Sequence, residues 1–105
     1  MASYEIRFFF DPGSGICLWS ANDEARERFG YPIEIESLEL SENLHRKALY
    51  LLRWYDTSLD WSSPGDPSPW SHDERLRFLN AAREFLDKLR EFLGPEFEIR
   101  DAVKA

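Results

Sequence analysis

Hydrophobic residues recur at helical spacing through the last third of the chain. Positions three and four residues apart predict one apolar helix face, made by Leu76, Leu79, Ala82, Leu86, Leu89 and Leu93 and widened by Phe78, Phe85 and Phe92. The opposite face is charged and consists of Arg83, Glu84, Asp87, Lys88 and Glu91. Ser71 to Glu74 has the form of a capping box, in which the serine oxygen accepts from the Glu74 amide and the glutamate side chain returns to the Ser71 amide. Gly94-Pro95 ends this predicted helix.

A second amphipathic pattern begins at Ser41. Placed at 100° per residue, one stripe of about 100° of arc contains Leu44, Ala48, Leu51, Leu52, Tyr55 and Leu59. Tyr50, Trp54 and Trp61 fall together on another side if the helix persists that far. This second, aromatic stripe is not explained by packing along a single face.

The first third of the chain has the pattern of strands and one short helix. Tyr4 to Phe10 is rich in aromatic residues, and the turn signal Asp11-Pro12-Gly13-Ser14-Gly15 separates it from Ile16 to Trp19, so we predict a β-hairpin. A short helix is predicted over 23–29, between an Asn22 cap and Gly30.

Two further segments alternate in polarity. Ile33 to Glu36 alternates as an edge strand does, while Leu38 to Leu40 fits either strand or extended loop. Glu96 to Arg100 alternates around Phe97 and Ile99 and is predicted to form the last strand.

The order of these elements predicts a single α+β domain over residues 1–105. The chain length is typical of one domain. Two wide-faced helices need a sheet to cover. We therefore expect an antiparallel sheet of three to four strands, made by the N-terminal hairpin and the C-terminal strand, with two long helices and one short helix on one face.

Acidic residues outnumber basic ones by twenty to thirteen, a net charge of −7. This charge disfavours nucleic acid and anionic membranes, which attract Lys and Arg, and favours a basic protein partner, although solubility alone also explains it. Two windows contain acids and no bases: Phe29 to Leu44, with Glu34, Glu36, Glu39 and Glu42, and Trp54 to Glu74, with Asp56, Asp60, Asp66, Asp73 and Glu74.

The lone Cys17 and the N-terminal residues favour the cytoplasm. A small secreted domain normally carries disulfides, so a single cysteine indicates a reducing compartment. The N-terminus has no basic region, and its longest apolar run is Phe8 to Phe10, so we expect neither a signal peptide nor a membrane span.

Residues suited to catalysis are few. His45 and His72 have no partner at metal-ligand spacing, Cys17 lies within a predicted strand, and Gly13-Ser14-Gly15 lacks the lysine of a phosphate-binding loop. We expect no enzymatic activity, no metal and no cofactor. A small enzyme that uses a histidine and a carboxylate remains the third alternative.

The segment from Trp54 to Trp70 combines three tryptophans, stiffening prolines and aspartates. Tryptophan is a favoured interface anchor because it buries a large area at little entropic cost. The candidate partner-binding residues are Trp54, Asp56, Asp60, Trp61, Asp66 and Trp70, with Glu34, Glu36, Glu39 and Glu42 as a second surface. The alternative is that the tryptophans, Trp54 and Trp70 above all, pack the loop onto the helices.

The runs WYDTSLDW and PGDPSPW, with FGYP around Tyr31, resemble a group of small acidic bacterial proteins over most of the chain. In size and acidity the chain is also similar to immunity proteins of bacterial toxin–immunity pairs. That resemblance implies a protein partner, a basic toxin domain, as our leading hypothesis. A regulatory or structural module, homodimeric through Tyr50, Trp54 and Trp61, is the second hypothesis.

Overall fold

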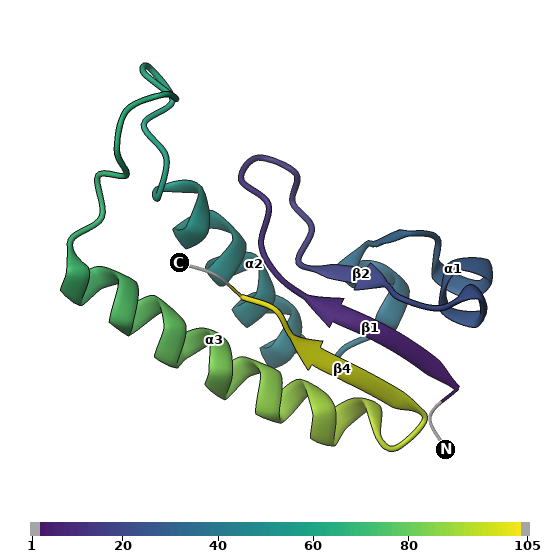
Figure 1. Cartoon of the computed structure of the whole chain (residues 1–105). Helices are drawn as coiled ribbons and strands as arrows, with labels where there is room; N and C mark the ends of the chain where they lie inside the picture. Colours follow the sequence, from purple (N-terminus) through teal and green to yellow (C-terminus); the bar gives the residue numbers. More distant parts are fainter. Residues whose placement is uncertain (1–2, 104–105) are drawn as a thin grey trace.

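The structure is a computed structural model that describes residues 3–103, and it confirms the α+β class (Figure 1). Its elements in chain order are β1 (Tyr4–Phe8), β2 (Leu18–Ser20), α1 (Asp23–Phe29), β3 (Pro32–Ile33), the 3-10 helix η1 (Ile35–Leu38), α2 (Glu42–Asp56), α3 (His72–Leu93) and β4 (Phe97–Asp101). The predicted hairpin, the short helix, both long helices and the last strand are all present.

The sheet has the order β3-β2-β1-β4, and its β1–β4 pairing is parallel. We predicted an antiparallel sheet, and the β1–β2 and β2–β3 pairs are antiparallel. The direction of β4 is set by α3, because the turn at Gly94, whose φ is +82°, reverses the chain directly after the helix. The C-terminal strand therefore runs beside β1 in the same direction.

The predicted edge strand over Ile33 to Glu36 is only partly correct. Pairing with β2 is confined to β3, and at Ile35 the backbone turns into η1. Ile33 and Ile35 are both buried. The alternation thus identified the inward side chains, but a turn of 3-10 helix also satisfies that burial without extending the sheet. Glu39 follows in the left-handed region, with φ +49°.

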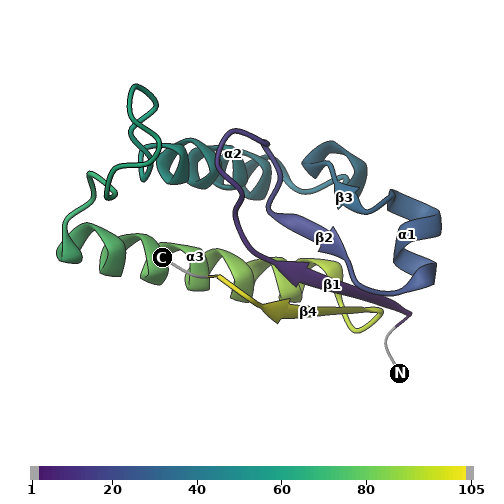
Figure 2. The same ribbon diagram turned by 45° about the horizontal axis from the view of Figure 1, so that its top comes forward.

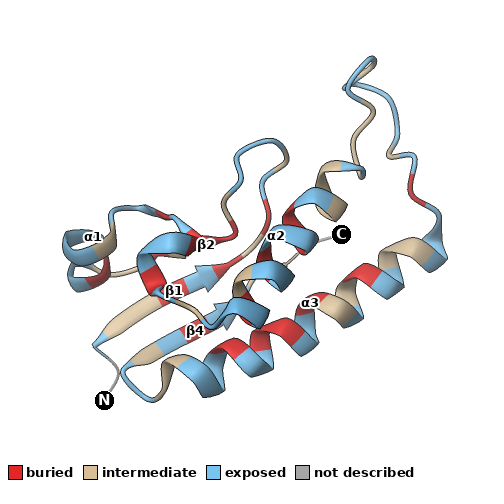
Figure 3. Ribbon diagram, turned by 180° about the vertical axis from the view of Figure 1, so that it is seen from behind, coloured by how far each residue is buried: buried red, intermediate tan, exposed pale blue. Residues whose placement is uncertain are grey.

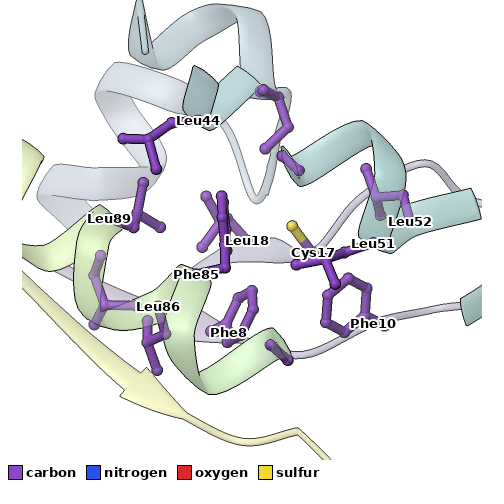
Figure 4. Packing of buried hydrophobic residues seen from close by; sticks show 14 of the residues in the cluster. Phe8, Phe10, Cys17, Leu18, Leu44, Leu51, Leu52, Phe85, Leu86 and Leu89 are labelled. Carbon is purple, nitrogen blue, oxygen red and sulfur yellow. The ribbon is translucent and has the colours of Figure 1, made fainter. Parts of the chain in front are cut away.

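Helices α2 and α3 cover one face of the sheet, as predicted (Figures 2 and 3). Between them and the strands, Phe8, Leu18, Leu51 and Phe85 are almost fully inaccessible to solvent (Figure 4). The apolar face of α3 is narrower than predicted. Its buried members are Phe78, Ala82, Phe85, Leu86 and Leu89, whereas the side chains of Leu76 and Phe92 are each 47% exposed.

Both long helices begin at their predicted serine caps. The Ser71 hydroxyl oxygen accepts from the Glu74 amide at 3.1 Å. The Glu74 carboxylate, predicted to return to the Ser71 amide, instead accepts from the indole N–H of Trp54 at 3.0 Å. Helix α2 ends at Asp56, so the predicted aromatic stripe stops at Trp54 and Trp61 belongs to the following loop.

Replacement of Leu51 by alanine is expected to lower the free energy of unfolding by about 2–5 kcal/mol, because Leu51 is fully buried and the change leaves a cavity. The matched control is Leu49→Ala on the same helix, where the side chain is 37% exposed and the expected loss is under about 1 kcal/mol. Urea unfolding followed by circular dichroism measures both. Equal losses would contradict the described core.

Candidate functional site

The loop from residue 57 to residue 71 projects from the body between α2 and α3 (Figure 1). The end of α2 that leads into the loop and the last part of the loop both pack on Phe78 of α3. The ring centroids of Trp54, Tyr55, Trp70 and Phe10 lie between 5.0 and 5.4 Å from that of Phe78. This aromatic cluster joins the loop to α2, to α3 and to the segment that follows β1.

Trp54 and Trp70 make contacts that support the loop. Trp70 is only 6% exposed, and its indole N–H donates to the Thr57 hydroxyl at 2.7 Å. This bond joins the first residue after α2 to the last part of the loop. Trp54 is half-buried and is fixed by its bond to Glu74. These two tryptophans therefore pack the loop onto the helices, as the alternative in the sequence analysis describes.

Trp61 differs from both, because its side chain is 56% exposed. Its indole N–H donates to the backbone carbonyl of Asp56 at 2.9 Å, and its ring lies against Gly13 in the β1–β2 turn. The Asp56 carboxylate accepts from the Gly13 amide at 2.8 Å. We call Gly13, Asp56 and Trp61 the loop–turn junction. It holds a large aromatic side chain in place at the surface.

Asp60 and Asp66 lie on the projecting loop. Two hydrogen bonds from Ser62, from its hydroxyl at 2.6 Å and its amide at 3.0 Å, lower the pKa of the Asp60 carboxyl below its ordinary value. Asp66 is exposed, and its amide donates to the Ser63 carbonyl at 3.0 Å. The loop therefore presents fixed negative charge beside Trp61.

Folding adds residues to this surface that the sequence windows did not include. The β1–β2 turn brings Gly13, and with it the exposed Asp11, to the loop. Arg75 of α3 lines a shallow hollow of about 200 Å³ with Ser58, Ser68 and Trp70. The basic side chain of Arg75 thus lies at the end of the loop nearest the helices, whereas the projecting part of the loop remains acidic.

The second acidic segment lies at the other end of α2. Glu34, Glu36, Glu39 and Glu42 are all exposed, and Glu42 pairs with Arg46 one helical turn later. Asp56 ends the same helix, about 21 Å further along its axis at 1.5 Å per residue. The two predicted surfaces are therefore separate, and the structure does not bring them together.

The residues considered for catalysis remain apart. His45 is half-buried near the start of α2, whereas His72 is exposed at the start of α3. Cys17 is fully buried, and burial raises the pKa of its thiol to about 12. Within residues 3–103, no group of three or more His, Cys, Asp and Glu side chains could hold a metal ion. No helix in this part of the chain is long and apolar enough to span a bilayer.

An α+β scaffold that holds an exposed tryptophan and carboxylates on a projecting loop has the features of small protein-binding domains. The chain belongs to the Serratia CdiI immunity protein-like family, whose model matches residues 5–101. This match confirms the likeness to immunity proteins in type. No curated protein sequence matches the chain.

Gly13→Ala is expected to destabilise the protein through two effects. The residue has φ +80°, and an added Cβ would lie 3.0 Å from the Trp61 ring. Gly15→Ala is the matched control, because Gly15 has φ +71° and no atom near the added Cβ. Gly13→Ala should therefore lose about 1 kcal/mol more than Gly15→Ala in urea unfolding.

The same comparison in a Trp61→Ala background isolates the contact with the ring. There the extra loss should disappear, because the added methyl group no longer meets an indole. An extra loss that persisted without Trp61 would show that the ring does not lie on Gly13.

Cys17 is expected to be unreactive in the folded protein. With its pKa raised to about 12, almost no thiolate exists at pH 8, and the buried sulfur is inaccessible. A chromogenic disulfide reagent should release no thiol signal from the native chain and about one equivalent in 8 M urea. Rapid native labelling would contradict this placement.

Proposed function

We propose that this protein is an immunity protein that neutralises a toxin domain by binding it through the loop–turn junction and the acidic loop beside it. Membership of the immunity protein-like family supports a toxin as the partner. The net charge of −7 and the aspartates of the loop support a partner that is basic. A basic substrate cleft on the toxin would be occupied and closed by this projection.

The observation that carries the proposal is the position of Trp61. A tryptophan that is 56% exposed leaves apolar area in water, yet its indole N–H and its ring are both already fixed by Asp56 and Gly13. A side chain ordered before binding loses little entropy on association. Trp61 therefore has the properties of an interface anchor, and Asp60 and Asp66 supply the charge around it.

Trp54 and Trp70 have a supporting role in this proposal. They hold the two ends of the loop on Phe78, so that Trp61 and the aspartates project in a fixed arrangement. Asp56 contributes through the junction that it makes with Gly13. The exposed glutamates Glu34, Glu36, Glu39 and Glu42 remain a second candidate surface at the far end of α2.

We expect a toxin gene directly upstream of this one, and the test is binding of its toxin domain, measured by titration calorimetry. Trp61→Ala should weaken binding about thirtyfold or more, as loss of an interface anchor does. Asp60→Ala should weaken binding less, with a larger effect at low salt because its charge acts over distance. Unchanged circular dichroism spectra confirm that each variant is folded.

The matched control is the exposed face of α3, where Arg83→Ala and Glu84→Ala should leave affinity unchanged. Full affinity in Trp61→Ala, combined with a loss in the α3 variants, would refute the proposed surface. Absence of any binding by the wild type would refute the immunity function. Concentration-dependent dimerisation lost in Tyr50→Ala would then favour the homodimeric module, since Tyr50 is 57% exposed.

A further inference from the structure

The face of the sheet away from α2 and α3 carries a second group of aromatic residues. Phe9 and Trp19 stack with ring centroids 4.9 Å apart and planes 4° from parallel, and the Tyr31 ring lies 5.4 Å from that of Trp19. Trp19 is fixed by a bond from its indole N–H to the Phe9 carbonyl at 3.1 Å. Tyr31 is 50% exposed. In Figure 3, which views the molecule from behind, both long helices lie on the side of the strands opposite to this aromatic face.

The same face carries an arginine without a counter-charge. Arg7 is exposed, and within residues 3–103 its side chain makes no hydrogen bond and no ion pair. It pairs in register with Trp19 of β2 on one side and with Arg100 of β4 on the other. Two like charges opposite each other on neighbouring strands are unfavourable. The nearby carboxylates do not relieve Arg7, because Glu5 and Glu98 both face Arg100, at 3.3 and 3.8 Å.

An open hollow of about 540 Å³ lies beside this arginine. It is lined by Arg7, Phe9, Phe10 and Ala102 together with Tyr55. The hollow lies at the end of β1 and β4, whose last register pair is Phe8 with Asp101. A guanidinium at the edge of an apolar hollow is suited to a carboxylate on a chain that also buries carbon, because partial desolvation strengthens the pairing.

We propose that Arg7, Phe9, Trp19 and Tyr31 form a second docking surface, the sheet-face patch, which binds an acidic segment of the same toxin domain. This inference rests on the proposed immunity function. Phe9 of this patch lies four residues before Gly13 of the β1–β2 turn, and Gly13 contacts Trp61, so the turn connects the two surfaces. A basic region of the toxin would contact the acidic loop, and an acidic region of the toxin would contact this patch. Such opposite charges fix the orientation of a complex.

The charges of the chain favour a protein over a nucleic acid as the occupant. The patch offers one unpaired arginine, and the whole chain has a net charge of −7. Nucleic-acid affinity depends on neutralising many phosphates, which this face cannot do. A second copy of the chain would bring the same net negative charge and the same unpaired Arg7.

The test measures the affinity of the upstream-encoded toxin domain for the full chain and for Arg7→Glu and Tyr31→Ala variants by titration calorimetry. Arg7→Glu should weaken binding about thirtyfold or more, and Tyr31→Ala about threefold to tenfold. Arg83→Glu on the solvent face of α3 is the matched control, because it makes the same charge change away from both surfaces. It should bind as the wild type does.

The failures of the two proposals are distinguishable. Wild-type protein that does not bind the toxin refutes the immunity function itself. The sheet-face patch alone is refuted by a different result. In that case the wild type binds and Trp61→Ala weakens binding, but the affinities of Arg7→Glu and Tyr31→Ala equal that of the control Arg83→Glu. A further contrary result would be a wild-type dimer in light scattering that Arg7→Glu converts to a monomer without a change in toxin affinity. That result refutes the sheet-face patch as a toxin-binding surface and assigns this face of the sheet to self-association. Thermal unfolding of each variant confirms that lost affinity is not lost folding.

Discussion

The packing of four aromatic rings around Phe78 is the constraint on which the arrangement of the projecting loop depends. Phe78 is completely buried, and its neighbours come from the segment that follows β1, from α2 and from the far end of the loop. A loop of this length would ordinarily be mobile. Here both of its ends are fixed to one side chain, so the ordering entropy is lost during folding and not during binding. That is why the loop can present Trp61 in one position.

The hairpin turn extends this constraint to the outermost part of the loop. Asp56 bonds to the Gly13 amide with its side chain and to the Trp61 indole with its backbone carbonyl. The segments that flank this turn carry Phe9 and Trp19, which lie on the face of the sheet away from α2 and α3. An acidic surface and a surface with an unpaired arginine are therefore joined through a few residues at one end of the fold. In the proposed complex, a partner that contacts both would be held in a single orientation, because rotating it would bring like charges together.

Most of the fold could be predicted from the sequence, because the apolar periodicities report directly on which side chains are buried. The serine caps, the hairpin and the helix over 23–29 depend on local chemistry and are correct. The direction of β4 could not be predicted, since alternation is the same in parallel and antiparallel strands. Likewise, Ile33 and Ile35 are buried in a strand and in a 3-10 turn alike, so their spacing did not distinguish the two. Both errors concern backbone direction, which side-chain polarity does not record.

The site was less predictable, as the tryptophans show. Trp54, Trp61 and Trp70 lie in one sequence segment of uniform character, yet their indole N–H groups find a carboxylate, a backbone carbonyl and a hydroxyl on different elements. Those partners decide which ring is buried, and none is implied by the local sequence. Trp19 lay outside the acidic windows and was expected only as a strand residue, although it stands on the open face of the sheet beside Arg7. Exposure of an aromatic ring depends on its tertiary neighbours, so the local sequence could not show that Trp61, unlike Trp70, is both fixed and largely exposed.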